Sequence, residues 1–302
     1  MTPTSENRIR LIVNGKAALA PELREAVALA RNAGQALEVR VTWEGGDAAR
    51  YVTEAITDGA RSIIAGGGDG TLNEVAGALL DHAAGQRPVL GLLPLGTAND
   101  FARGVGIPTD LPAALRLALV GEPRAIDAGR VNDRVFLNMA TGGFGTQVTA
   151  ETPDEQKSAL GAFAYLLTGL KRLNAIQADR LRVEGPGFQW EGEFLVLAVG
   201  NGIQAGGGHR LCPQALLDDG LLDLRILAGG ELLPALLERL LAGEEAERMI
   251  GARLPWLTLE TPSEIQLNLD GEPLAGTRFR IEALPAALRM RLPADSPLLG
   301  QP

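Results

Sequence analysis

Four short segments of the chain combine glycines with carboxylate, amide and hydroxyl side chains, and this combination suits phosphoryl chemistry. The first segment follows the apolar run from Ser62 to Ala65. A strand, a glycine turn and a helix present unpaired backbone amides to a phosphate. Because a bare carboxylate would repel a polyphosphate, Asp69 predicts a divalent metal or a hydrogen-bond network at this turn, unless the segment is only an ordinary Asp-Gly turn. The residues of this segment are Gly66, Gly67, Gly68, Asp69, Gly70, Thr71, Leu72, Asn73 and Glu74.

Two common phosphate-binding motifs do not fit the first segment. The chain contains no Gly-x-x-x-x-Gly-Lys-Ser/Thr pattern, so the segment is not a P-loop. The dinucleotide-binding fingerprint also fails, because Thr71 and Asn73 stand where its third glycine would be.

The second segment, from Leu93 to Arg103, again follows an apolar strand that ends near a glycine. Thr97 and Asn99 can donate hydrogen bonds to phosphate oxygens, and Asp100 can orient a metal-bound water or a substrate hydroxyl. Taken alone, Asn99 or Asp100 could equally be a helix cap. Proximity to the first segment on a neighbouring strand favours a functional role.

The third and fourth segments lie later in the chain and resemble turns. Asp218 and Asp219 before Gly220 are typical of a hairpin turn, although such acids and nearby carbonyls are also hard oxygen ligands for Mg²⁺ or Ca²⁺. In Asp270-Gly271-Glu272-Pro273, a carboxylate fixed at a strand end suits a general base for a hydroxyl, but the same letters also form everyday turns.

Strands and helices alternate in the first part of the chain, which predicts a doubly wound α/β sheet. Such sheets bind ligands at the carboxyl ends of their strands, where Asn14, Lys16 and Thr42 also lie. The predicted strands are Arg8–Asn14, Glu38–Thr42, Ser62–Ala65 and Val89–Leu95, and the predicted helices are Pro21–Ala33, Asp47 to before Gly59, Thr71–Leu80 and Asp110–Val120.

After about Ala125 a period of two appears, which predicts an antiparallel β-sandwich. We place the domain boundary near residue 128, giving an α/β domain over 1–127 and a sandwich over 128–288. The predicted strands are Arg134–Ala140, Arg180–Glu184, Leu222–Ile226, Glu264–Asp270 and Arg278–Ala283, and the predicted helices are Ser158–Leu173 and Glu231–Ala242.

Composition and charge limit the kinds of partner and the cellular location that we expect for the protein. A net charge of −9 over 302 residues, with no basic cluster, argues against nucleic acid as a partner. The single cysteine, Cys212, excludes an internal disulfide and fits a reduced compartment. The N-terminus has no signal-peptide pattern, and no apolar stretch is long enough to span a bilayer. We therefore expect a cytoplasmic protein whose only membrane contact is peripheral, at the inner face.

Taken together, the four segments resemble the diacylglycerol kinase catalytic-domain superfamily, and most closely its bacterial YegS-like lipid kinases. The first segment alone would fit NAD kinases or phosphofructokinases equally well. The resemblance covers nearly the whole chain and rests on GGGDGTLNEV (66–75), LPLGTANDFAR (93–103), GGG with CPQALLDDGLLDLRI (206–226) and LDGEPL (269–274).

The resemblance implies an ATP-dependent enzyme built from a nucleotide-binding α/β domain and a β-sandwich, with residues 289–302 returning to the first domain. It assigns nucleotide contacts to Thr42, Gly68–Glu74 and Thr97. It assigns a metal site to the carbonyls of Leu216 and Leu221 and the carboxylate of Asp219, and the proton acceptor to Glu272. Many relatives have Asn-Pro-x-Ser/Ala-Gly after the first strand, whereas this chain has Asn14-Gly15-Lys16-Ala17, in which Lys16 could supply a phosphate charge.

We therefore predict a kinase that phosphorylates a lipid hydroxyl at the membrane surface, with Mg²⁺ held through Asp69 or Asp100 and waters, and Ca²⁺ as an option at Asp219. The apolar stretch from Ala159 to Leu170 is a candidate wall for acyl chains. An NAD or sugar kinase on the same scaffold, or a nucleotide- or lipid-binding module without catalysis, are the alternatives. The sequence gives no expectation for the oligomeric state.

Overall fold

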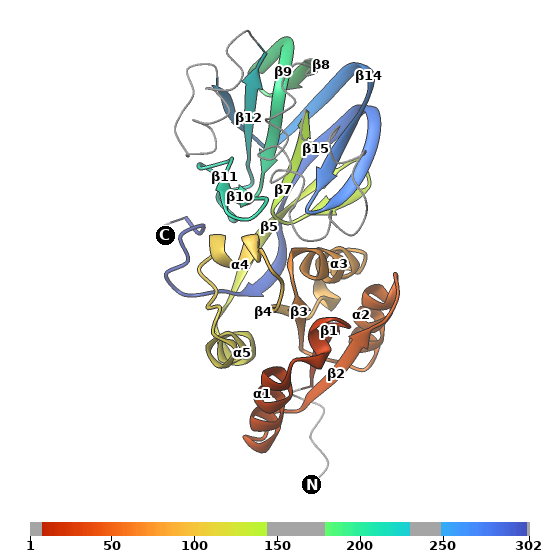
Figure 1. Cartoon of the computed structure of the whole chain (residues 1–302), viewed down its shortest axis with the longest axis vertical. Helices are drawn as coiled ribbons and strands as arrows, with labels where there is room; N and C mark the ends of the chain where they lie inside the picture. The colour runs from red at the N-terminus through yellow and green to blue at the C-terminus, as the bar shows by residue number, and fades with distance from the viewer. Residues whose placement is uncertain (1–7, 144–178, 230–248, 301–302) are drawn as a thin grey trace. The chain divides into compact units, whose positions relative to one another are not determined.

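A computed structural model describes residues 8–143, 179–229 and 249–300 of the chain (Figure 1). The chain divides into two compact units. The first unit comprises Met1–Ile126 and Ala286–Leu299, and the second comprises Asp127–Pro285 and Gly300–Pro302. The first boundary lies one residue before the predicted one. The returning segment begins three residues earlier than the predicted 289 and ends at Leu299 instead of residue 302.

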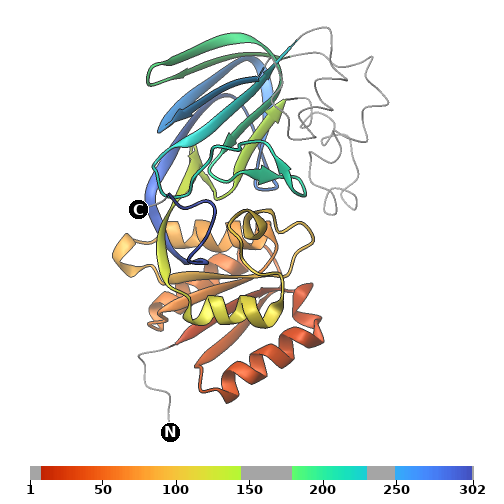
Figure 2. The same cartoon turned by 90° about the vertical axis from the view of Figure 1, so that its left-hand side faces the viewer.

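The first unit is a doubly wound α/β domain. Its parallel strands lie in the order β2-β1-β3-β4. Figure 2 shows α1 and α5 on one face of this sheet and α2 and α3 on the other. The strands are β1 (Ile9–Asn14), β2 (Leu37–Thr42), β3 (Ser62–Gly67) and β4 (Val89–Pro94). The helices are η2 (Ala17–Leu19), α1 (Pro21–Asn32), α2 (Asp47–Thr57), α3 (Asp69–Leu80), η3 (Ala84–Gln86), α4 (Asp100–Gly104) and α5 (Leu111–Val120).

Local sequence explains where these elements begin and end. Every residue of β3 is buried, as expected for a central parallel strand covered on both faces. Helix α1 begins with Pro21, whose missing N–H costs nothing in the first turn, and the chain leaves the helix through Gly34 at a φ of 88°. Asp110 caps α5 by accepting a hydrogen bond from the amide of Ala113 at 3.0 Å.

The C-terminal part of the chain completes the first unit. The last residues of β15 (Glu272–Arg291) run parallel to β4, with Met290 opposite Leu90. Arg291 donates hydrogen bonds to the carbonyl of Gly121 and to Ser62 Oγ. Arg87 fastens the same segment by donating to the carbonyl of Ala287 at 2.7 Å. The segment Arg289–Leu299, expected to pack on the first domain, belongs to the first unit.

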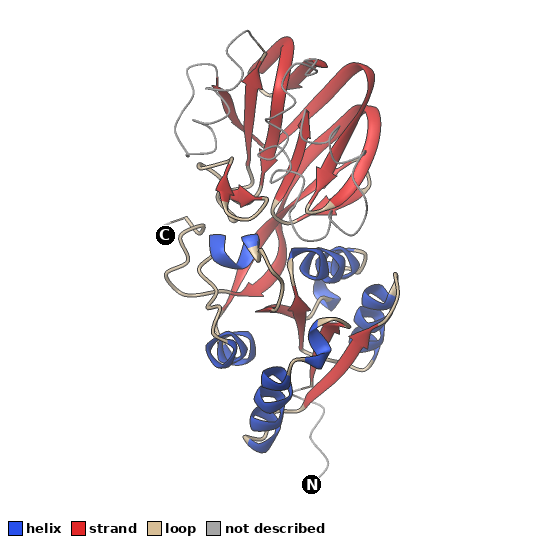
Figure 3. Cartoon of the chain, viewed as in Figure 1, coloured by secondary structure: helices blue, strands red, loops and turns tan. Residues whose placement is uncertain are grey.

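The described part of the second unit contains strands and loops but no helix (Figure 3). The long strands β9 and β14 each pair with β8 through one half and with β7 through the other. These four strands therefore surround a common core. That core contains Phe136, Phe194 and Phe279. Besides β15, the strands are β5 (Pro123–Val131), β6 (Arg134–Phe136), β7 (Met139–Gly143), β8 (Asp179–Gly185), β9 (Phe188–Gly200), β10 (Gln204–Ala205), β11 (His209–Arg210), β12 (Leu222–Ala228), β13 (Met249–Leu254) and β14 (Trp256–Leu269).

The predicted strand Arg134–Ala140 is wrong as a single element, because the structure divides it into β6 and β7. The break lies at Leu137 and Asn138, whose amides donate to the carboxylate of Asp270. The strands β5, β9, β10, β11 and β13 were not predicted. In β9 only the first half alternates in burial, while the second half is buried throughout and has no period of two. The predicted helices Ser158–Leu173 and Glu231–Ala242, and the candidate acyl-chain wall, lie outside the described residues.

None of the helices in the described part of the chain combines the length and apolar character needed to cross a bilayer.

We predict that Arg87→Met destabilises the first unit by about 2 to 4 kcal/mol, because three carbonyls lose a charged donor. These carbonyls belong to His82, Ala287 and Leu80, at 2.8, 2.7 and 3.1 Å. Denaturant unfolding of the full chain measures the change. Arg116→Met removes an exposed arginine of α5 and should change the free energy of unfolding by less than about 0.5 kcal/mol. Equal effects of the two substitutions would show that Arg87 does not fasten the returning segment.

Candidate functional site

The loops that follow β3 and β4 touch through their backbones. A Cβ on Gly96 would lie 2.4 Å from the Cα of Gly68, and a Cβ on Gly68 would lie 3.2 Å from the Cα of Gly96. Any larger residue at Gly96 would therefore push the two loops apart. Gly68 is also the N-cap of α3, which begins at Asp69, two residues earlier than the predicted Thr71. The structure thus brings the first two predicted segments together.

Asp69 joins these two loops. Its carboxylate oxygens accept hydrogen bonds from the amides of Asp100 at 3.0 Å and Phe101 at 2.9 Å, the first amides of α4. Burial raises the pKa of Asp69, the nearby carboxylate of Asp100 acts in the same direction, and the two amides oppose the shift. Of the two explanations for a carboxylate among glycines, the structure shows the hydrogen-bond network. The expected roles of Asp69 and Asp100 in catalysis or metal binding stay predictions.

Asn99 holds its own loop instead of capping α4 with its side chain. Its backbone adopts the left-handed conformation at a φ of 50°. Its Oδ1 accepts a hydrogen bond from the amide of Gly96 at 2.9 Å, and its Nδ2 donates to the carbonyl of Gly96 at 2.8 Å. Thr97, beside it, is exposed and can reach a ligand. The loop therefore presents a hydroxyl on a fixed backbone.

The end of β1 is fastened to both neighbouring loops. Asn14 donates to Thr71 Oγ1 at 3.5 Å and accepts from the amide of Lys16 at 3.0 Å. A Cβ on Gly15 would lie 2.7 Å from the carbonyl oxygen of Thr42. The glycine at this position, where the chain departs from many relatives, thus lets the loop pass close to the end of β2 and leaves the Lys16 side chain exposed.

Asp47, which is not among the predicted site residues, fixes the loop that carries Thr42. Its Oδ2 accepts hydrogen bonds from the amides of Trp43 at 2.7 Å and Glu44 at 3.2 Å, and its Oδ1 pairs with Arg50 at 2.6 Å. The Arg50 hydrogen bond, together with the two amides, lowers the pKa of Asp47 to about 2. An Asp three or four residues after a pair of loop amides is a pattern that could have predicted these hydrogen bonds.

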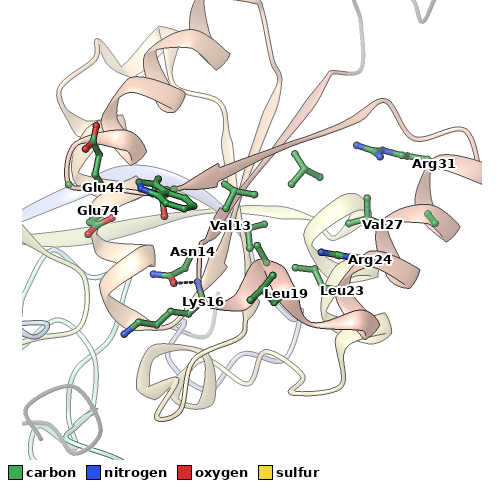
Figure 4. A pocket seen from close by; sticks show the side chains of 18 residues that line it. Val13, Asn14, Lys16, Leu19, Leu23, Arg24, Val27, Arg31, Glu44 and Glu74 are labelled. Carbon is green, nitrogen blue, oxygen red and sulfur yellow. Dashed lines mark hydrogen bonds between the residues drawn. The ribbon is translucent and has the colours of Figure 1, made fainter. Parts of the chain in front are cut away.

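A pocket of about 960 Å³ lies beside the ends of β1 and β2. Figure 4 shows Asn14 and Lys16 toward the end where Glu44 and Glu74 lie, and Leu19, Leu23 and Val27 toward the end where Arg24 and Arg31 lie. Trp43, a residue that is 93% exposed, also lines it. Four predicted nucleotide contacts, Asn14, Lys16, Thr42 and Glu74, thus share one pocket. Gly66–Asn73 and Thr97 are not among the residues that line it.

The turn that carries Glu272 is held by the preceding aspartate. Leu269 and Glu272 pair across the two-residue turn Asp270-Gly271, where both φ values are positive, 49° and 105°. The Asp270 carboxylate accepts hydrogen bonds from three successive backbone amides. Glu272 itself is exposed at the start of β15. The predicted proton acceptor therefore stands on a rigid turn and its carboxylate is open to solvent. The three donors are Leu137 at 2.6 Å, Asn138 at 3.0 Å and Met139 at 2.8 Å.

The predicted metal ligands lie on the loop before β12. Asp219 Oδ1 accepts a hydrogen bond from the amide of Leu221 at 2.9 Å. The other oxygen, Oδ2, is buried and pairs with the guanidinium of Arg253. The carbonyls of Leu216 and Leu221 and the Asp219 carboxylate are hard oxygen donors of the type that Mg²⁺ accepts, so the donor set fits. In the described residues, no group of three or more His, Cys, Asp or Glu side chains is arranged to hold a metal.

We predict that Asp270→Asn destabilises the second unit by about 2 to 4 kcal/mol, because a side-chain amide would place its NH₂ against a backbone N–H. Thermal and denaturant unfolding of the full chain measure the loss. Asp133→Asn, at an exposed position of the same unit, is the matched control and should leave stability within about 0.5 kcal/mol. A stability of Asp270→Asn equal to that of the control would contradict the proposed holding role.

Two protein-family models together match most of the chain. Residues 8–131 match the diacylglycerol kinase catalytic domain, and residues 139–292 match the YegS C-terminal NAD kinase beta sandwich-like domain. The division between these matches agrees with the α/β unit and the strand-rich unit seen in the structure.

Individual relatives agree with the family match. Proteins named "Probable lipid kinase YegS-like" from Yersinia pestis (strain Pestoides F) and Yersinia pseudotuberculosis serotype O:1b (strain IP 31758) are each 55% identical over 291 residues, 96% of this chain and 98% of their own length. A crystal structure of a "putative diacylglycerol kinase" from Bacillus anthracis strain Sterne is 27% identical, has a TM-score of 0.82, and covers 96% of this chain and 99% of its own. The chain therefore belongs to the diacylglycerol kinase catalytic-domain family and, within it, to the YegS-like lipid kinases.

Proposed function

We propose that this lipid kinase uses ATP and transfers its γ-phosphoryl group to a hydroxyl of a phosphatidylglycerol-like or diacylglycerol-like lipid. The pocket at the ends of β1 and β2 supports ATP as the donor most directly, because it gathers Asn14, Lys16, Thr42 and Glu74 around a largely apolar space. A nucleotide needs both an apolar wall for the base and polar groups for the ribose and phosphates. The named relatives support a lipid as the acceptor.

In this proposal the base lies against the apolar part of the pocket, and the phosphates run toward the glycine loop. The exposed ammonium of Lys16 supplies positive charge that the glycine loop lacks. The amides of Gly66–Thr71, from the end of β3 to the first turn of α3, and the hydroxyl of Thr97 bind phosphate oxygens. The Asp69 clamp and the Gly68–Gly96 contact hold these donors in place before the nucleotide arrives, which favours transfer by positioning the donor.

The transfer itself is a displacement at the γ-phosphorus. The lipid hydroxyl oxygen forms a new bond to phosphorus, the bond to the bridging oxygen breaks, and ADP leaves with its electron pair. Glu272 accepts the proton of the attacking hydroxyl. Its exposed carboxylate on a rigid turn suits this role, because a general base must keep a fixed direction while staying accessible to its substrate.

Leu216, Leu221 and Asp219 would hold Mg²⁺, or Ca²⁺ as an option, at the loop before β12, and Asp69 or Asp100 would hold Mg²⁺ through waters. When bound near the phosphates, such an ion supplies charge neutralisation for the transferred group. We also propose that the enzyme is cytoplasmic and meets its lipid by peripheral contact with the membrane surface.

Incubation of the protein with ATP, Mg²⁺ and total bacterial lipid should yield a phosphorylated lipid, identified by its mass. Parallel reactions with NAD and with sugars distinguish a kinase of those molecules on the same scaffold. Phosphorylation of NAD or a sugar but of no lipid would overturn the proposed acceptor. ATP binding without turnover of any of these acceptors would favour a non-catalytic binding module.

Glu272→Gln should lower the rate of lipid phosphorylation by at least about 100-fold while ATP still binds, because the amide cannot take the hydroxyl proton. Initial rates with saturating ATP, together with ATP binding by calorimetry, separate these effects. The matched control is Glu264→Gln, which removes an exposed carboxylate of β14 and should retain the wild-type rate. Full activity of Glu272→Gln would rule out the proposed base.

Gly15→Ala should weaken ATP binding by about tenfold or more, because the new Cβ forces the loop away from the Thr42 carbonyl by several tenths of an ångström. Gly45→Ala changes a glycine that lines the same pocket but has open space around it, so it is the control and should bind ATP normally. Calorimetric titration with ATP measures both. Unchanged affinity in Gly15→Ala would argue against nucleotide binding in this pocket.

A further inference from the structure

We propose that Arg253 is the resident cation of the Asp219 loop, and that a divalent metal binds there only by displacing its guanidinium. This inference rests on the proposed metal site but concerns a residue of this chain that the motif carrying that site does not contain. Arg253 lies on β13, more than thirty residues after the Asp219 loop. The fold brings the guanidinium to the carboxylate of Asp219.

Both oxygens of the Asp219 carboxylate are already engaged. The amide of Leu221 donates a hydrogen bond to Oδ1 at 2.9 Å, and Arg253 forms an ion pair with Oδ2, which is buried and accepts no hydrogen bond from the described residues. The Asp219 side chain is 21% exposed, so leaving its charge without a cation would be costly. A metal that takes Oδ2 as its ligand must occupy the space beside that oxygen, where the guanidinium now lies.

Among the described residues, Arg253 forms an ion pair with no carboxylate other than Asp219. It stands opposite Asp223 in the β12–β13 register, but Asp223 already pairs with Arg225 at 2.9 Å and accepts the amide of Gln214 at 2.8 Å. The Arg253 side chain is 33% exposed, so it has a path outward into solvent. Arg253 can therefore move away from Asp219 without breaking the Asp223 network.

The backbone of the Asp219 loop is fixed independently of Arg253. The amide of Gly220, at a φ of 71°, donates to Asp127 Oδ2 at 2.6 Å. Asp218 Oδ1 accepts the amide of Gly300 at 2.8 Å. Exchange of the guanidinium for a metal would thus change side-chain partners while the loop keeps its backbone contacts.

The competition depends on charge, because a divalent cation and the guanidinium would repel each other if both stayed at Asp219. Arginine remains protonated throughout the accessible pH range, so deprotonation cannot relieve this repulsion. The wild-type protein should consequently bind Mg²⁺ and Ca²⁺ weakly at this loop. Removal of the guanidinium charge should strengthen binding of either ion.

Calorimetric titration of the full chain with MgCl₂ and with CaCl₂, without ATP or lipid, tests this competition. Arg253→Met should bind either ion about tenfold more tightly than wild type, a difference of about 1.4 kcal/mol. Arg253→Lys retains the charge and should bind as weakly as wild type. Arg278→Met is the matched control, because Arg278 also pairs with a carboxylate of the second unit, Glu260 at 3.2 Å, and should leave metal binding unchanged. Adding Asp219→Asn to Arg253→Met should remove the gain.

Melting temperatures provide a second readout that does not depend on activity. Either metal should raise the melting temperature of Arg253→Met more than that of wild type, since a ligand that binds only the folded state stabilises it. Equal metal affinity of wild type and Arg253→Met, or a gain that survives Asp219→Asn, would overturn the proposal. If neither metal ion bound to any variant, both this proposal and the proposed metal site would be overturned. The proposed lipid kinase activity would not be affected, because the separate assay with ATP and lipid extract tests it.

Discussion

The direct backbone contact between the loops after β3 and β4 is the constraint on which the first unit depends. Gly68 and Gly96 meet without side chains between them, and Asp69 crosses the contact to bind the first amides of α4. Two loops from neighbouring strands thus become one rigid surface, whose remaining amides and hydroxyls would bind phosphate in the proposed function. A fixed array of donors is what phosphate binding requires, because donors that need no rearrangement lose little entropy on binding.

Several aspartates of this chain act on the backbone of a neighbouring loop. Asp47, Asp69, Asp127 and Asp270 each accept one or more backbone amides. A carboxylate that accepts amides satisfies donors that a loop would otherwise leave unpaired, and charge makes these hydrogen bonds strong. Glu44 and Glu272 are exposed by contrast. These four aspartates therefore hold the backbone of loops.

Prediction from the sequence succeeded where local chemistry decides the structure. Helix α1 begins at the predicted Pro21, and α5 begins directly after Asp110, where its predicted range started, because Asp110 is its cap. Prediction failed at Leu137 and Asn138, where apolar alternation continues but a carboxylate more than 130 residues away takes the amides and ends the strand. The pairing of Arg253 with Asp219 could not be predicted from the sequence either, because the two residues meet only through strand pairing.

The sequence by itself determined the α/β and strand-rich halves, the glycine segments and the family, because these follow from hydrophobic period, turn chemistry and motifs within short stretches. Only the tertiary structure decided which polar groups share a pocket and which carboxylates are already engaged. Asn14, Thr42 and Glu74 come from three different elements, and their meeting depends on the register of β1 with β2 and β3. Partners of this kind are set by packing between distant segments, which no local pattern encodes.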